Sequence, residues 1–247
     1  MVRRVRRWFR HMRWRVAPYR ASVAGLIRRR RVVHMLHIGK TGGTAVKVAL
    51  RRCRKDPSVK THILLHRHRV RLADIPPWDD VFFFVRDPTS RYISAFHSRQ
   101  REGRPAHYHP WRPEERRIFE RFPTADALAR SLVSPDAKTR RAARRAMMRI
   151  PHVNSGLPRW LSDKDLLERR RSRIILVGRQ ESLATDFQRL RQLLDLPATC
   201  TLPTADSIAH RSTGLQPTDL SAEAQAGLRA WFRADFELLD LLETWAR

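Results

Sequence analysis

Short apolar runs rich in β-branched and aromatic residues alternate along the chain with longer segments whose apolar positions recur every three or four residues. The short runs predict buried strands, and the longer pattern predicts amphipathic helices. We expect strands near 32–38, 61–65, 81–85 and 174–178, and helices near 43–52, 88–102, 113–121, 124–132, 138–149, 163–170, 181–194 and 221–243. This alternation predicts an α/β fold, a single domain with a central, mainly parallel sheet flanked by helices.

A glycine-rich segment joins the first predicted strand to the first predicted helix. It reads Gly39-Lys40-Thr41-Gly42-Gly43-Thr44. The first N–H groups of a helix have no partner within the helix, and the helix dipole favours negative charge there. Lys40 adds a cation, Thr41 and Thr44 add hydroxyls, and Gly42 and Gly43 allow the backbone to approach an anion. The segment therefore predicts a phosphate loop, although it is not a Walker A loop, whose lysine follows the glycines. A surface turn with a solvated lysine is the simpler alternative.

A second basic motif follows the third predicted strand. Arg86 ends that strand, Asp87-Pro88 begins a helix, and Arg91 and Ser94 lie further along the helix. Proline suits the first helical position, and ligands of open α/β sheets bind at the carboxyl ends of strands. Arg86 and Ser94 can hold a terminal phosphate there. An ion pair of Arg86 with a neighbouring acid is the alternative.

The two motifs together resemble those of the sulfotransferases that use 3′-phosphoadenosine 5′-phosphosulfate (PAPS). The closest resemblance is to the carbohydrate branch that includes heparan sulfate 2-O-sulfotransferase and many bacterial relatives. It implies a P-loop-like nucleotide-binding core with PAPS as co-substrate. The 5′-phosphosulfate would lie on Lys40, Thr41, Gly42, Gly43 and Thr44, and the 3′-phosphate on Arg86 and Ser94. Many members have proline where this chain has Gly39.

Later segments support the same resemblance. Residues 174–183, followed by Asp186-Phe187, resemble the family's late strand and the helix after it. Residues 210–213 resemble its C-terminal loop, which implies that Thr213 touches the nucleotide and Arg211 holds an anionic acceptor. The resemblance covers about residues 32–245, with a poor match over 105–160.

Sulfuryl transfer to a hydroxyl needs a base on the acceptor and positive charge on the leaving phosphate oxygen. Lys40 suits the second task, so no metal is required in principle. The family's base is a histidine in a His-x-His segment, which matches His68 here, with His66 as the second candidate. We expect Arg67 and Arg69 to keep His68 neutral. A solvated or structural histidine is the alternative, because the chain has 11 histidines.

The charge of the chain is extreme and uneven. The net charge is +27; residues 1–60 hold fifteen Arg, four Lys and one acid, whereas residues 181–247 hold six Arg and ten acids. Such a field attracts polyanions. It suits a carbohydrate or glycolipid acceptor that is itself anionic. The densely basic segment 138–149 reads as a solvated helix face unless the acceptor is a polyanion.

The N-terminal residues form a separate region. Apolar positions between Val2 and Val16 recur every three or four residues among arginines, which predicts a basic amphipathic helix that could contact an anionic membrane surface. A helix docked on the domain and a disordered basic tail are the alternatives. We expect an arm over 1–30 and a sulfotransferase domain over 31–247. No apolar stretch is long enough to span a bilayer, so we expect a cytoplasmic protein, peripheral at the inner membrane face. The two cysteines, Cys53 and Cys200, leave a single disulfide open.

Two other functions compete with this interpretation. A nucleotide-dependent phosphotransferase would need a Walker A loop and a carboxylate for magnesium, and neither is evident. A basic nucleic-acid-binding protein would use the N-terminal charge, but no helix-turn-helix or RNA-binding motif supports a nucleic-acid partner. A relative that binds PAPS without catalysing transfer is a third alternative.

Overall fold

The structure is a computed structural model that describes residues 16–25, 27, 30–105, 108–204 and 219–245. The chain divides into two compact units. We call Met1–Val85 with Pro158–Pro203 the sheet unit, and Arg86–Leu157 with Thr204–Arg247 the helical unit. The predicted division into an arm and one domain at residues 30 and 31 stays a prediction.

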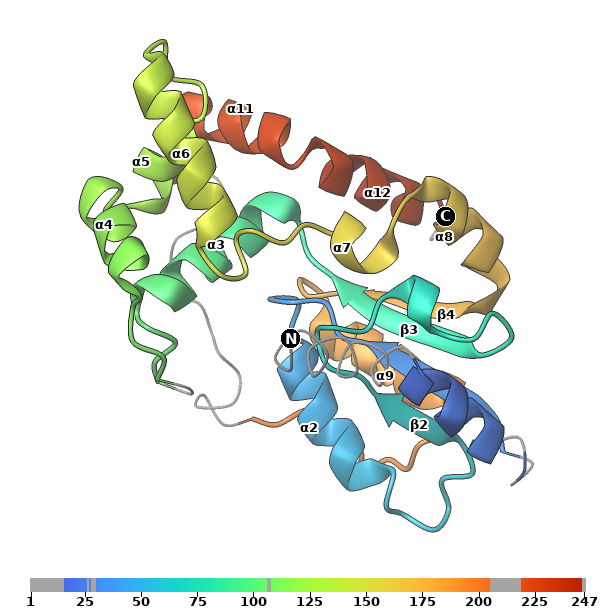
Figure 1. Ribbon diagram of the computed structural model, residues 1–247. Coiled ribbons are helices and arrows are strands. Elements are labelled where there is room, and N and C mark those ends of the chain that lie inside the picture. Colours follow the sequence, from blue (N-terminus) through green and yellow to red (C-terminus); the bar gives the residue numbers. More distant parts are fainter. Residues whose placement is uncertain (1–15, 26, 28–29, 106–107, 205–218, 246–247) are drawn as a thin grey trace, which may run out of the picture. The chain divides into compact units, whose positions relative to one another are not determined.

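The sheet unit contains the four predicted strands, β1 (Val32–Leu36), β2 (His62–Leu65), β3 (Asp80–Val85) and β4 (Ile174–Arg179). They form one sheet in the order β2-β1-β3-β4, and every neighbouring pair is parallel (Figure 1). This confirms the predicted α/β class with a parallel sheet. The strands are apolar because both faces of a parallel sheet are covered.

One face of the sheet carries the core of the sheet unit. Successive strand residues point to opposite faces, so Val33 and Met35 share a face and His34 points to the other. Val33 and Met35 pack with Phe82 and Phe84 and with apolar residues of the helices α2 (Gly43–Cys53) and α9 (Leu183–Leu193). Gly178 is required here, because a Cβ at this position would lie 2.4 Å from Phe84 Cε1.

A disulfide joins two distant parts of the sheet unit. Cys53, at the end of α2, is bonded to Cys200, and 147 residues separate them in the sequence. The structure thus decides the pairing that the sequence leaves open.

Short helices complete the sheet unit. Residues 16–25 are helical. The other short elements are the 3-10 helix η1 (Leu72–Asp74), α7 (Pro158–Leu161), α8 (Lys164–Arg170) and the 3-10 helix η2 (Arg171–Arg173). The buried Arg170 guanidinium donates to the carbonyl oxygens of Ile75 at 2.9 Å and Pro76 at 3.0 Å, and so fixes α8 to the segment before β3.

The helical unit contains α3 (Pro88–Gln100), α4 (Pro113–Arg121), α5 (Ala125–Arg130), α6 (Ala137–Arg149), α11 (Ala222–Trp231) and α12 (Arg233–Thr244). A second core joins α3, α4, α5, α6 and α11 through small and aromatic side chains. The segment 221–243, predicted as one helix, is two helices that meet at Phe232. Phe232 is buried, and its ring centre lies 5.3 Å from the Arg91 guanidinium.

Arg91 is a structural residue of the helical unit. It is 1% exposed, and its guanidinium donates to Asp235 Oδ1 at 3.1 Å and to the carbonyl oxygen of Ser155 at 2.6 Å. Asp235 Oδ1 also accepts from the backbone N–H of Leu157 at 2.8 Å. This buried ion pair connects α3, α12 and the segment that contains Ser155 and Leu157.

The predicted amphipathic helix of residues 2–16 lies outside the described residues except for Val16. Among the helices that the structure describes, none combines the length and the apolar character needed to cross a membrane.

Candidate active site

The glycine-rich segment forms a tight loop between β1 and α2. Lys40 has φ 68° and Gly42 has φ 78°, so two residues within three positions adopt the left-handed region. Glycine takes this conformation freely, whereas a lysine there is uncommon and strained. A Cβ on Gly42 would also lie 2.9 Å from Leu183 Cδ2. The backbone of this loop is thus fixed by its own geometry and by α9.

The loop presents an open helix N-terminus. Gly42 is the N-cap of α2, no side chain caps the helix, and its first turn contains no acidic residue. The N–H groups of Gly43 and Thr44 therefore have no acceptor within the helix. Thr44 is exposed at this end. These features fit the anion site predicted from the sequence.

Thr41 makes a hydrogen bond within its own loop. Its side chain is 1% exposed, and its hydroxyl donates to the carbonyl oxygen of Ile38 at 3.0 Å. This hydrogen bond closes the loop, and the contact of Thr41 with the 5′-phosphosulfate stays a prediction.

The two sequence motifs follow β1 and β3, which are the two central strands of the sheet. The connection from β1 leads to β2 on one side, and the connection from β3 leads to β4 on the other. Ligands of open α/β sheets bind at the carboxyl ends of strands where the connections diverge in this way. The loop that carries Lys40 follows β1, and Arg86 directly follows Val85, the last residue of β3.

Arg86 and Ser94 belong to the helical unit. Asp87 caps α3 by accepting from the backbone N–H of Ser90 at 2.7 Å, and Pro88 is the first helical residue, as predicted. Arg86 is half-buried, and Ser94 is buried two turns into α3. Their role as ligands of a phosphate stays a prediction.

His68 lies in the sheet unit with one ring nitrogen fixed by the backbone. Its Nδ1 lies 3.0 Å from the carbonyl oxygen of His37, and the two imidazole rings are 3.8 Å apart. A carbonyl can only accept, so we assign the proton to Nδ1 and the lone pair to Nε2. The Trp160 indole N–H donates to the carbonyl oxygen of His68 at 2.8 Å and fixes the backbone there.

His66 belongs to a buried relay. His66 Nε2 lies 2.8 Å from His34 Nδ1, and His34 Nε2 lies 2.9 Å from Asp79 Oδ2. Because the carboxylate accepts from His34 Nε2, His34 Nδ1 accepts in turn from His66 Nε2. Burial lowers the pKa of His34 to about 3 and that of His66 to about 3, so both imidazoles are neutral at physiological pH.

The pKa of His68 is lowered, which favours the neutral form that we expected, but the main cause is burial. Burial lowers the pKa of His68, its hydrogen bond to His37 opposes this change, and the charges of Lys47, Arg159 and Lys40 lower the pKa further. These cations come from other segments of the chain than Arg67 and Arg69, from which we expected the effect. Lys47 is 6% exposed within α2, and its pKa falls to about 8 because of burial and the neighbouring arginines 51 and 67.

Three residues of this site were not predicted from the sequence. Lys47 could have been noticed as a lysine between two valines, one turn after the glycine-rich loop. His34 and Asp79 give no local signal, because their partners are distant in the sequence.

Two predicted contacts cannot be placed. Arg211 and Thr213, expected to contact the acceptor and the nucleotide, lie outside the described residues. Within the described ranges, no three His, Cys, Asp or Glu side chains gather as a metal site.

Comparison with known proteins agrees with the geometry of the loop. The sequence model of the sulfotransferase family matches residues 25–241, which is most of the chain and includes both units. The chain belongs to the sulfotransferase family. No curated protein and no solved structure matches the chain.

The family establishes the general activity of this sulfotransferase. It is an enzyme that transfers sulfuryl groups to an acceptor, and PAPS is in general the sulfuryl donor of the family. The open N-terminus of α2, with its left-handed glycine and without acidic neighbours, fits an anionic donor of this kind.

Proposed function

We propose that this sulfotransferase transfers the sulfuryl group of PAPS to a hydroxyl of a carbohydrate or glycolipid acceptor, with His68 as the base. The observation that carries this proposal is the hydrogen bond from His68 Nδ1 to the carbonyl oxygen of His37. It leaves the lone pair on Nε2, and the lowered pKa of His68 keeps that nitrogen able to accept a proton at neutral pH.

In this mechanism each group of the chain has one task. His68 Nε2 takes the proton of the acceptor hydroxyl as its oxygen forms a bond to sulfur. The bond from sulfur to the phosphate oxygen breaks, and adenosine 3′,5′-bisphosphate leaves. Lys40 and the N–H groups of Gly43 and Thr44 stabilise the charge that develops on the leaving oxygen. His66, held by His34, supports the segment that carries His68.

The remaining ligands follow from the resemblance to the carbohydrate branch. Arg86 and Ser94 would hold the 3′-phosphate, Thr213 would touch the nucleotide, and Arg211 would hold an anionic acceptor. Gly42 and Gly43 allow the close approach of the 5′-phosphosulfate, and Thr41 shapes the loop through Ile38. No step of this mechanism needs a metal. The relation to heparan sulfate 2-O-sulfotransferase and its bacterial relatives belongs to this proposal.

Calorimetric titration tests the donor site. We expect adenosine 3′,5′-bisphosphate to bind more tightly than 5′-AMP or ATP with magnesium. Lys40→Ala and Arg86→Ala should each weaken this binding, whereas Lys55→Ala, at an exposed lysine two residues after α2 ends, should not. Preference for ATP would contradict the donor assignment and favour the phosphotransferase alternative.

Transfer assays test the base. His68→Ala should lower turnover by about 10²- to 10⁴-fold while binding of the bisphosphate is preserved, because general base catalysis contributes about this much. His109→Ala, at an exposed histidine, is the control. If His68→Ala turns over normally and His66→Ala does not, the base is His66.

Two further questions, the cellular location of the protein and the alternative of nucleic-acid binding, need experiments of their own. The predicted cytoplasmic placement, with residues 2–16 at the inner membrane face, is opposed by the Cys53–Cys200 disulfide, because disulfides form and persist mainly in oxidising compartments. Fractionation of cells with thiol labelling would decide between them. A nucleic-acid-binding function would require tight, strongly salt-dependent binding of DNA or RNA.

A further inference from the structure

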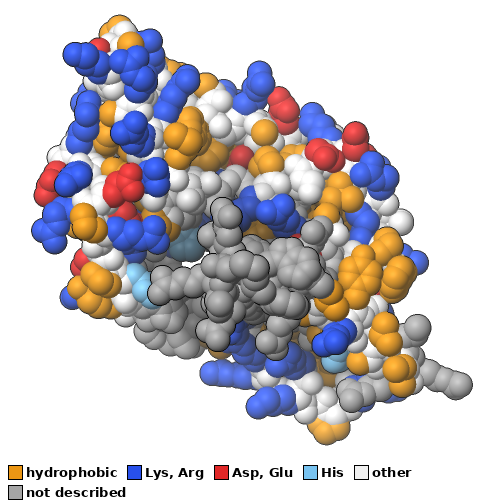
Figure 2. Space-filling model, in the orientation of Figure 1, with side chains coloured by type: hydrophobic (Ala, Val, Ile, Leu, Met, Phe, Trp, Pro, Cys, Tyr) orange, Lys and Arg blue, Asp and Glu red, His pale blue; other side chains and the backbone are white. Residues whose placement is uncertain are grey.

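The helix of residues 16–25 in the sheet unit exposes a stripe of large apolar side chains. Val16, Tyr19 and Val23 follow one another at spacings of three and four residues, and Ile27 lies four residues further on. Residues at these spacings share one face of a helix. Their exposed fractions run from 40% at Tyr19 to 77% at Ile27. Figure 2 shows hydrophobic side chains at the surface over this helix, at the lower right.

The opposite face of the same helix packs on the protein. Pro18, Ser22 and Gly25 are buried there, and a Cβ on Gly25 would overlap Val32 Cγ2 of β1. A helix that only completes the core places its large apolar residues on the buried face. Here the small residues face the core and the large apolar residues face water. Such an exposed apolar surface marks an interaction site.

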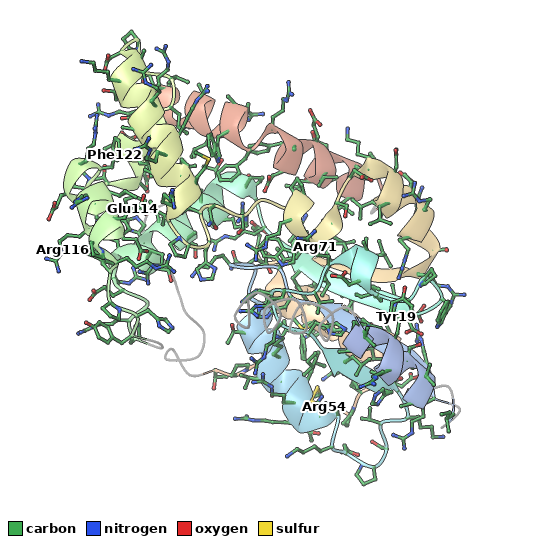
Figure 3. The ribbon with its side chains drawn as sticks, viewed as in Figure 1. Tyr19, Arg54, Arg71, Glu114, Arg116 and Phe122 are labelled. Atoms are coloured by element: carbon green, nitrogen blue, oxygen red, sulfur yellow. A yellow bond between two sulfur atoms is a disulfide. The ribbon has the colours of Figure 1, made fainter. Side chains whose placement is uncertain are left out.

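Trp78, from the segment before β3, extends this surface. Its indole N–H donates to Ser22 Oγ at 3.1 Å, and its ring lies 6.0 Å from the ring of Tyr19, edge to face (Figure 3). Trp78 is 56% exposed although its N–H has a partner, so its apolar ring is available. Of the nine large hydrophobic side chains that the described part of the chain exposes, five lie on this surface. We call these five residues the apolar patch: Val16, Tyr19, Val23, Ile27 and Trp78.

The surroundings of the apolar patch are basic. Arg20, which follows Tyr19 on the helix, is exposed, and so is Arg30 after the helix. Asp80, two residues after Trp78, forms an ion pair with Arg31 at 2.7 Å. Residues 1–55 contain no acid at all. The partner of the apolar patch must therefore accept apolar side chains and positive charge together.

We propose that the apolar patch docks on an anionic membrane surface, with its side chains among the lipid headgroups and the neighbouring arginines on the lipid phosphates. An anionic membrane offers both an apolar layer and negative charge, and Trp and Tyr side chains favour the boundary between water and lipid. A second copy of the chain offers an apolar surface but brings the same cations face to face, which is unfavourable. The inference goes beyond the transfer reaction, because it depends on neither His68 nor the donor site, and it adds a folded element to the membrane contact predicted for residues 2–16.

The test compares two double variants of the full chain that each lose two exposed apolar side chains. Val23→Gln with Ile27→Gln, the patch variant, leaves the buried face of the helix unchanged and keeps a good helix former at both positions. Val133→Gln with Met148→Gln, the control variant, removes two exposed apolar side chains of the helical unit. Binding is measured by co-sedimentation with vesicles of phosphatidylglycerol and phosphatidylcholine in equal parts, and with vesicles of phosphatidylcholine alone, at low and at physiological salt.

We expect the wild type to bind the anionic vesicles, more weakly as salt rises, and to bind the neutral vesicles poorly. The patch variant should bind the anionic vesicles about tenfold or more weakly, because two branched side chains no longer enter the headgroup region, and the control variant should bind like the wild type. Arg20→Gln with Arg30→Gln should also weaken binding about tenfold, whereas Arg117→Gln with Arg145→Gln, at exposed arginines of the helical unit, should not.

Equal binding by the wild type and the patch variant would overturn the proposal, and any vesicle binding would then belong to another part of the chain, such as residues 1–15, which no variant changes. Equal losses in the patch and control variants would overturn it as well. Sedimentation velocity without lipid tests the second copy, since wild-type dimers that dissociate in the patch variant would assign the patch to that interface instead. Thermal unfolding and binding of adenosine 3′,5′-bisphosphate are measured on the same proteins. If the patch variant does not fold, Ile27→Gln alone, at the most exposed position, takes its place. A protein that binds the bisphosphate but not the vesicles refutes the patch alone, whereas failure to bind the bisphosphate refutes the donor site.

Discussion

The buried relay of Asp79, His34 and His66 makes the stability of the protein sensitive to mild acid. The pKa values of His34 and His66 fall from 6.5 to about 3 in the folded protein. The two histidines of the unfolded chain therefore bind protons below pH 6.5, whereas those of the folded protein stay neutral down to about pH 3. The contribution of the two neutral histidines to the free energy of unfolding is thus fully present above pH 6.5 and is lost as the pH falls.

The size of this loss follows from the two pKa values. Each histidine costs about 1.4 kcal/mol for each pH unit below its unfolded pKa, so at pH 5 the cost is about 2 kcal/mol per histidine. Together they should lower the free energy of unfolding by about 4 kcal/mol relative to pH 7.5. Burial raises the pKa of Asp79, and its protonation in the folded state opposes part of the loss.

Urea unfolding at pH 7.5 and pH 5, followed by circular dichroism and tryptophan fluorescence, measures the effect. His34→Gln keeps one donor and one acceptor but cannot gain a proton, so the loss should fall to about 2 kcal/mol. His109→Gln, at an exposed histidine of the helical unit, should retain the loss of the wild type. An unchanged loss in His34→Gln, or no loss in the wild type, would refute the reasoning.

Three further predictions concern stability and are measured by denaturant unfolding. Reduction of the Cys53–Cys200 bond should cost about 5 kcal/mol, because the bond closes a loop with a sequence separation of 147, and a variant with serine at both positions should not respond to reductant. Asp235→Ala should cost about 3–5 kcal/mol, since it leaves the Arg91 guanidinium buried without its charge partner; a cost below 1 kcal/mol would contradict this. Gly178→Ala should cost about 1–3 kcal/mol through overpacking against a buried aromatic ring, and normal stability would show that the ring can move.

Much of the fold could be predicted because its signals are local. All four strands are short apolar runs, and the glycine-rich loop and Asp87-Pro88 are sequence-adjacent features that begin α2 and α3 as expected. The interruption at Phe232 could not be predicted, because segment 221–243 contains no proline and its apolar positions continue past Phe232.

The site divides in the same way. The loop that carries Lys40 and Gly42 could be predicted because it directly follows a strand, whereas the role of His68 as the base rests on the resemblance to a family and stays a prediction. The relay could not, because His34 is 32 residues from His66 and 45 residues from Asp79. The hydrogen bond from the Thr41 hydroxyl to Ile38 could not be predicted either, because the sequence shows that a donor is present but not which acceptor it binds.

The disulfide also orders events during synthesis of the chain. At typical rates of translation, Cys53 emerges about 7 to 30 s before Cys200, and no other cysteine exists with which it could pair in the meantime. An early oxidation can therefore join Cys53 only to another molecule, such as a second nascent chain or a small thiol. Covalent dimers on a non-reducing gel would thus report oxidation that came too early, and not an incorrect pairing within one chain.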